Sequence, residues 1–206
     1  MSYNSLLSYG DFIALNLKCN VNKLFQEIEP FTFQKYNPRK SHIKRNGLSI
    51  TSLNGELDGI DLDSMKEYNK ENNVTYNEHT FKTFTEVFYK SNEIQNLIIP
   101  FTEHTLRSHI LHLPPGGYFP PHRDMHVYKN KQESFRVLVP LKNCNPPHMY
   151  FIYEEKVLNF EHGRAYFLNT NKAHSLFSFL DSYMIVLNID SNEETYEIIG
   201  ENMMLS

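Results

Sequence analysis

The feature that most limits the fold of this chain is a series of short β-prone segments in its second half. Runs rich in Val, Ile, Leu, Phe and Tyr follow one another, and clusters of Pro, Gly and Asn separate them. About eight such segments in succession are typical of a sandwich, a barrel or a jelly roll. No helical crossover lies between them, which disfavours a parallel α/β sheet. The predicted strands are 105–113, 118–122, 134–141, 148–153, 156–160, 165–168, 174–179 and 183–189.

The first hundred residues have a different character. Apolar residues recur at helical spacing over Val21–Glu29, and Pro30 ends this predicted helix. Gly47–Leu53 is β-prone and is closed by the turn pair Asn54-Gly55. The remaining expectations are an extended lead-in over 1–20, a loop over 31–46, an acidic surface excursion with one short helix over 56–80, and helix for part of 81–99. The excursion is a lid or, as we expect, a solvated loop. Strand is the alternative for Thr83–Phe88.

Length and composition indicate one ordinary globular domain. The chain has 206 residues, 40% of them hydrophobic, and no repeat or linker divides it. We therefore expect a single domain over 1–206, with α/β support over 1–102, a β core over 103–190 and a C-terminal tail over 191–206. This combination is a mainly β (α+β) fold whose N-terminal helices buttress the β core.

Charge and cysteine content narrow the possible partners. The net charge is −4 and the pI is about 6.2, so nucleic acid is not an expected partner. Cys19 and Cys144 form no CxxC pair, which fits a reducing compartment. No signal peptide or membrane span is evident. These features predict a cytoplasmic protein, and the sequence leaves its oligomeric state open.

The first motif with chemical content is Pro121-His122-Arg123-Asp124. Residues two apart on a strand point to the same face, so an imidazole and a carboxylate would lie together. His174 follows 52 residues after His122, which leaves enough chain for several strands to bring the two histidines side by side. Two imidazoles and one carboxylate that leave coordination positions open are the ligand set of non-haem Fe(II) oxygenases. His-x-Asp is common by chance, so the prediction depends on its position near a strand end.

Two arginines are candidates for binding an anion. Period two puts Arg136 on the side of Leu138 and Pro140, and a guanidinium among inward residues suits a carboxylate. An outward arginine on a solvated face fits the pattern equally well. Arg107 is similar, although the sequence around it shows no clear inward face.

From about Leu106 to Asp190 the chain resembles the aspartyl/asparaginyl β-hydroxylase-like branch of the Fe(II)/2-oxoglutarate dioxygenases, which includes bacterial proline cis-hydroxylases. Ordered agreement along the chain is more specific than His-x-Asp alone. The matching points are Leu113–Gly117, Pro121-His122-Arg123-Asp124, Phe135-Arg136, Gly163–Leu168, His174 and Met184–Asp190.

The resemblance implies a double-stranded β-helix, which is a cupin-like jelly roll. It implies Fe(II) on His122, Asp124 and His174, with 2-oxoglutarate and O₂ as co-substrates. Arg136 matches a family arginine that contacts the co-substrate. The implied reaction is hydroxylation of an amino-acid or peptidyl side chain (Asp, Asn or Pro), coupled to decarboxylation of 2-oxoglutarate to succinate. No catalytic side chain beyond the metal ligands is implied.

One position departs from the family pattern. The arginine that binds the distal carboxylate of 2-oxoglutarate falls at Ser182 here, and no Arg or Lys follows Lys172. Because a buried carboxylate without a cation is costly, Arg136, Arg107, His109 or His112 would have to replace it, or 2-oxoglutarate is not the co-substrate.

Two other readings of the sequence therefore stay open. One is a jelly-roll binding or structural module without catalysis, and the other is a cupin-like iron enzyme that does not use 2-oxoglutarate. The substrate is a small molecule or a peptide. The histidines and the tyrosine expected to flank the mouth of the site are His109, His112, His126 and Tyr128.

Overall fold

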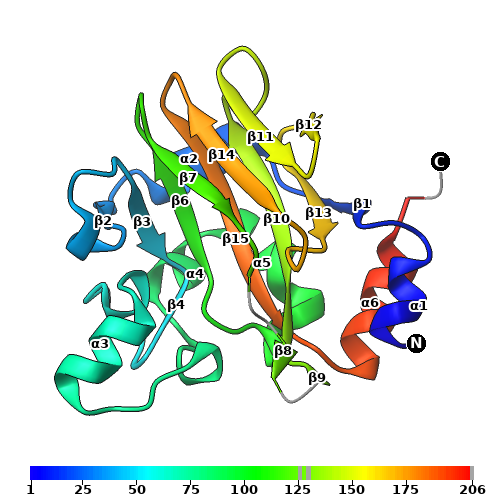
Figure 1. The fold of residues 1–206 in the computed structure, drawn as a ribbon, viewed down its shortest axis with the longest axis horizontal. Coiled ribbons are helices and arrows are strands. Elements are labelled where there is room, and N and C mark those ends of the chain that lie inside the picture. The colour runs from blue at the N-terminus through cyan, green and yellow to red at the C-terminus, as the bar shows by residue number, and fades with distance from the viewer. Residues whose placement is uncertain (125–126, 129–130, 205–206) are drawn as a thin grey trace.

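The computed structural model describes residues 1–124, 127–128 and 131–204, and the side chains of 127, 128 and 131 lie outside this description. Two antiparallel sheets face each other to form a jelly roll, the double-stranded β-helix (Figure 1). The large sheet has seven strands, in the spatial order β1 (Phe12–Lys18), β13 (Arg164–Leu168), β10 (Ser134–Lys142), β15 (Ser182–Asp190), β6 (His109–Leu113), β3 (Asn46–Ser49) and β2 (Gln34–Lys35).

The small sheet has four strands and supplies the second layer. Its order is β12 (Lys156–Leu158), β11 (Met149–Tyr153), β14 (His174–Ser178) and β7 (Tyr118–His122), so β7 is an edge strand. Its last residues before His122 are Pro120 and Pro121, and both are exposed. Two short pairs lie outside these layers: β4 (Thr51–Ser52) with β5 (Thr83–Phe84), and β8 (Val127–Tyr128) with β9 (Lys131–Gln132).

Helices cover the outer face of the large sheet. Asn20 caps α2, because its side-chain oxygen accepts a 3.1 Å hydrogen bond from the Lys23 N–H. Apolar residues of α2, α4, α5 and α6 form one buried cluster with the outward residues of the sheet, such as Val137 and Val139. The helices are α1 (Tyr3–Leu7), α2 (Val21–Ile28), α3 (Met65–Asn72), α4 (Glu86–Lys90), α5 (Asn92–Ile98), α6 (Glu193–Asn202) and the short 3-10 turns η1 (Pro38–Lys40), η2 (Ile60–Leu62), η3 (Glu78–Thr80) and η4 (Ile99–His104).

A second apolar cluster lies between the two sheets. Leu138 belongs to this cluster, whereas its neighbours Val137 and Val139 belong to the cluster under the helices. This alternation is the period of two that a strand imposes, and it places Arg136 on the inter-sheet face with Leu138.

The fold confirms the predicted jelly roll and corrects two details near the ends of the chain. Residues 1–20 are not only an extended lead-in, because they form α1 and then β1, which pairs with β13 at the edge of the large sheet. Ile13 and Leu15 are buried there at a spacing of two, a short alternation that the sequence contains. Residues 191–206, expected as a tail, contain α6, whose Ile199 is fully buried. Among the described residues, no helix is long and apolar enough to cross a membrane.

Candidate metal centre and its cavity

Three side chains converge where β7 and β14 meet. His122 ends β7, His174 begins β14, and the two are direct cross-strand partners. Asp124 lies two residues beyond His122, and its N–H donates a 2.9 Å hydrogen bond to the Thr170 carbonyl. One nitrogen or oxygen atom from each of the three side chains lies within 4.8 Å of the others. The structure thus brings together the three residues that the sequence singled out as metal ligands.

Backbone carbonyls orient both imidazoles. Nδ1 of His122 is 2.8 Å from the Pro120 carbonyl oxygen, and Nδ1 of His174 is 2.9 Å from that of Lys172. Nδ1 must carry the proton to donate these bonds, which leaves the Nε2 lone pair for a metal. Outer partners of this kind are typical of metal-ligating histidines.

Burial favours the neutral form of His174. Its ring is stacked on Phe151, with centroids 6.0 Å apart and an interplanar angle of 13°. Burial lowers the pKa of His174 below its ordinary value, so the imidazole is neutral near pH 7 and can donate a lone pair. Two imidazoles and a carboxylate form a donor set that suits Fe(II), and neither described cysteine belongs to the group.

The three ligands form part of the wall of a cavity of about 460 Å³ between the sheets. Its inner wall is apolar and comes from both sheets: Leu111, Leu138, Phe151, Leu176, Met184 and Val186. Its other wall is polar and includes Arg45, Glu78, Arg107, His109 and Arg136. A ligand in this space would therefore contact the metal position, apolar side chains and several cations at once.

Arg136 and Arg107 both line the cavity, and both have anionic partners. Arg136 Nε lies 3.3 Å from Asp124 Oδ2, and one of its terminal nitrogens lies 3.9 Å from Glu78 Oε1. Arg107 donates a 3.0 Å hydrogen bond to the Asp63 carbonyl and approaches Glu78 Oε1 at 3.4 Å. Arg136 therefore holds the outer side of Asp124, and Glu78 balances part of the charge of both guanidinium groups.

Glu78 is a site residue that the sequence prediction missed. It belongs to the segment 56–80, which we expected to be a solvated loop, yet it lies in the cavity wall. Its Oε2 accepts a 2.6 Å hydrogen bond from the Asn188 side chain in β15. Asn77 and Thr80 form a capping box around it, and this local pattern was the available signal.

Of the remaining predicted site residues, some line the cavity and others lie outside it. His109 lines the cavity and is buried, and in the described part of the chain its Nδ1 has no hydrogen-bond partner. Burial beside Arg107 and Arg136 lowers its pKa well below the ordinary value. His112 lies outside the cavity lining, stacked on Tyr183 at 4.3 Å and hydrogen-bonded to Asp181 at 2.8 Å.

Ser182 also lies outside the cavity lining. Its hydroxyl is 2.7 Å from that of Ser178 and donates to the Asn143 carbonyl at 2.9 Å, so it is used by local structure. His126 falls outside the described residues. Tyr128 is in β8, and its side chain is outside the description.

Comparisons with known proteins find no match by sequence and only distant similarity by structure. No protein-family model matches the sequence, and no curated protein matches it. A prolyl-4-hydroxylase from Pseudomonas putida is similar with a TM-score of 0.48 and 10% identity, over 91% of this chain and 96% of that one. A Trichoplax adhaerens prolyl hydroxylase in complex with a hypoxia inducible factor peptide gives a TM-score of 0.48 and 13% identity, over 92% and 88% of the two chains. The viral collagen prolyl hydroxylase of Paramecium Bursaria Chlorella virus-1 gives 0.47 and 8%, over 89% and 97%.

All three TM-scores are below 0.5. The three structures are prolyl hydroxylases, and the narrower resemblance to the aspartyl/asparaginyl branch stays a prediction.

Proposed function

We propose that the protein is an Fe(II)- and 2-oxoglutarate-dependent dioxygenase that hydroxylates an amino-acid or peptidyl side chain. The observation that carries this proposal is the convergence of His122, Asp124 and His174 within 4.8 Å at the wall of a cavity of about 460 Å³. A bound iron would supply O₂ activation and a position for chelating a 2-oxo acid.

The protein's own residues have positioning and shielding roles in this proposal. Pro120 and Lys172 carbonyls hold the two imidazoles with Nε2 available, and Arg136 holds Asp124 from its outer side. The apolar inner wall excludes water from the space beside the metal. The substrate would be a free amino acid or a peptide with an Asp, Asn or Pro side chain, as the sequence resemblance implies.

One observation favours a second candidate, a cupin-like iron enzyme that does not use 2-oxoglutarate. The strand β15 presents no cation to the cavity, since Ser182 is turned into local hydrogen bonds and Met184 and Val186 are apolar. A non-catalytic jelly-roll module is the third reading, and it predicts no turnover at all.

The test is succinate formation from 2-oxoglutarate by metal-free protein supplied with Fe(II) and ascorbate under air. We expect succinate to require iron and to disappear in His174→Ala, because one of the three ligands is lost, with iron affinity falling by more than about 100-fold. His148→Ala, which removes an exposed histidine in the loop before β11, is the matched control and should keep activity. Tight iron binding without succinate, and without any binding of 2-oxoglutarate, would contradict the proposal and favour the second candidate.

A further inference from the structure

Arg45 is a buried cation in the cavity wall that the proposed function has not yet used. It immediately precedes β3, is only 5% exposed and lines the cavity. Its guanidinium carbon lies 4.2 Å from the centroid of the Phe119 ring and 5.6 Å from that of Tyr36. Its Nε is buried without a hydrogen-bond partner among the described residues. The arginine is therefore held by aromatic faces, and its Nε donor is available to a ligand.

The two neighbouring arginines differ from Arg45 because each of them approaches a carboxylate. Arg107 and Arg136 both approach Glu78, and Arg136 also contacts Asp124. Among the described residues, no carboxylate lies within ion-pair distance of Arg45. Burial lowers the pKa of this guanidinium, because removing a charge from water without a partner is unfavourable. An anionic group on a ligand would supply the missing partner.

The strand register shows where this cation lies relative to the position that lacks one. Asn46 pairs with His112, and Ser182 pairs with Leu113. Arg45, one residue before Asn46, is therefore level with Leu113 in β6. It is also level with Ser182 in β15, which lies two strands away. Paired residues of neighbouring strands share a face, so Arg45 lies on the inter-sheet face, roughly 10 Å across the sheet from Ser182.

One aromatic ring, that of Phe119, lies next to both Arg45 and the candidate metal position. Phe119, which contacts Arg45, also lies next to His122, with ring centroids 6.0 Å apart. A five-carbon 2-oxo dicarboxylate spans on the order of 6 Å between its ends, given carbon–carbon bonds near 1.5 Å. Such a molecule fits between a metal held by His122 and a guanidinium stacked on Phe119.

We propose that Arg45 binds the distal carboxylate of 2-oxoglutarate, in place of a cation on β15. This inference rests on the proposed function, and it assigns the co-substrate site to a residue from the segment 31–46, which the sequence marked as a loop. A guanidinium with unused donors can bind a carboxylate through two parallel hydrogen bonds, and Phe119 fixes its plane.

The experiment compares two ligands that differ only at the distal end. 2-Oxoglutarate and 2-oxopentanoate have the same chain and the same 2-oxo acid, but the second has a methyl group where the first has its distal carboxylate. Binding of each to the Fe(II)-loaded protein without oxygen is followed by the visible charge-transfer absorption of a 2-oxo acid chelated to iron. We expect the wild type to bind 2-oxoglutarate far more tightly than 2-oxopentanoate.

Arg45→Gln should weaken 2-oxoglutarate binding by about 100-fold and leave 2-oxopentanoate binding nearly unchanged. Arg45→Lys keeps the charge without the planar fork and should bind with intermediate affinity. Lys44→Gln is the matched control, because Lys44 is an exposed lysine next to Arg45 in the chain, lies outside the cavity lining, and donates to the Pro115 carbonyl. This control should keep the wild-type preference between the two ligands. Unchanged iron binding and an unchanged circular dichroism spectrum show that each variant is folded.

The possible failures are distinguishable. If Arg45→Gln keeps the wild-type preference for 2-oxoglutarate, or if Lys44→Gln loses it as fully as Arg45→Gln does, the assignment to Arg45 is overturned while the proposed function stands. If iron-loaded wild type gives the absorption with neither ligand, the proposed function fails, and the inference about Arg45 fails with it.

Discussion

The two sheets of the jelly roll differ in what covers them. The large sheet has helices on one face and the small sheet on the other, and every residue of its strand β13 is buried. The small sheet alternates buried and accessible residues along β11 and β14, and its outer face exposes 39% of Ile152, 42% of Val157 and 41% of Phe177. The large sheet therefore carries most of the core, whereas the small sheet has a core on one side only.

The side chains of the candidate site are also divided between the two sheets. The two histidines proposed as metal ligands come from β7 and β14 of the small sheet, whereas Arg136 comes from the large sheet and Arg45 from the residue before its strand β3. The groups suited to a metal and the groups suited to an anion thus stand on opposite layers. Any ligand that spans the cavity depends on the spacing between the sheets, which the inter-sheet core fixes.

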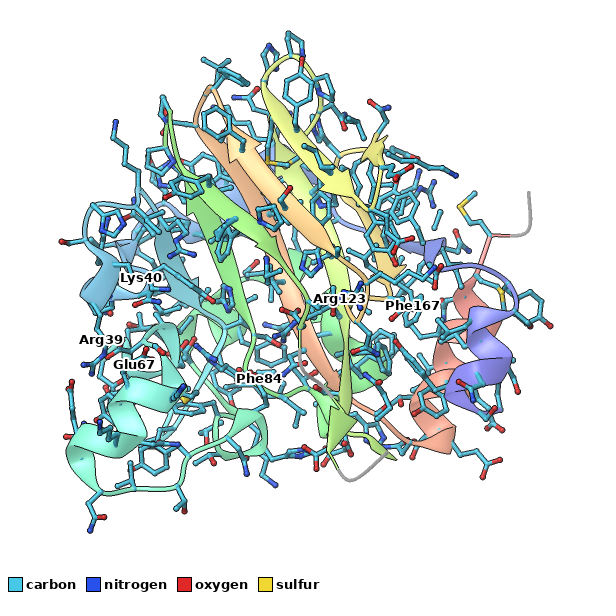
Figure 2. The ribbon with its side chains drawn as sticks, viewed as in Figure 1. Arg39, Lys40, Glu67, Phe84, Arg123 and Phe167 are labelled. Carbon is cyan, nitrogen blue, oxygen red and sulfur yellow. The ribbon has the colours of Figure 1, made fainter. Side chains whose placement is uncertain are left out.

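The largest effect on stability is expected from the large sheet. Phe167 in β13 is fully buried and contacts Phe135 and Tyr3, and Figure 2 labels it on the side of the molecule where α1 and α6 lie. Phe167→Ala should lower the free energy of unfolding by about 4 kcal/mol, because it leaves a cavity in the core. Urea denaturation measures this loss. A loss below about 1.5 kcal/mol would show that the covered sheet is less tightly packed than the comparison requires.

A pH-dependent contribution to the free energy of unfolding is expected from a buried carboxyl group beside the large sheet. Asp61 in η2 is buried against β3, where its Oδ1 accepts a 2.8 Å hydrogen bond from Ser49, and burial raises its pKa from 3.8 to about 6. The stabilising contribution of the protonated carboxyl is present below the unfolded-state pKa and is lost as pH rises through about 6. Asp61→Asn removes this dependence.

Between pH 4 and pH 7 the variant should therefore gain up to about 3 kcal/mol of unfolding free energy relative to the wild type. Urea denaturation of both proteins at several pH values provides the measurement. Parallel pH profiles for the two proteins would show that the carboxyl is ionised in the folded state throughout this range.

The smallest effect is expected on the outer face of the small sheet. Phe177→Ser should change the free energy of unfolding by no more than about 0.5 kcal/mol, because the side chain is already partly in water and contacts mainly Phe179. The same denaturation assay applies. A loss above about 2 kcal/mol that depends on protein concentration would mean that this face is covered in solution, and the contrast between the sheets would then be wrong.

The sequence predicted the β core well because its strands are short, apolar and bounded by turn residues. The predicted strand 118–122 coincides with β7, and the two histidines and Asp124 meet because strand pairing brings β7 beside β14. The spacing of these three residues along the chain was therefore sufficient to predict that they lie together.

Glu78 and Arg45 could not be found in this way. Each comes from a polar segment in the N-terminal half, and neither segment has a period that shows which side chain turns inward. Their places follow from tertiary contacts: Glu78 contacts Arg136 of the large sheet and Arg107, which lies two residues before β6, and the Arg45 guanidinium lies over the ring of Phe119 in the small sheet. The local sequence pattern therefore predicted the candidate metal ligands, whereas the residues proposed to surround an anion could be located only from the fold.

The proline pair at the end of β7 has a consequence for association between molecules. An edge strand offers unpaired N–H and C=O groups to which a strand of another chain can add. Pro120 and Pro121 have no N–H, and both are exposed on the free edge of the small sheet directly before His122. A second chain cannot complete a regular ladder there, so strand addition is blocked at the end of β7 that bears the metal ligand. The residues that present the imidazole thus also protect the molecule against edge-to-edge aggregation.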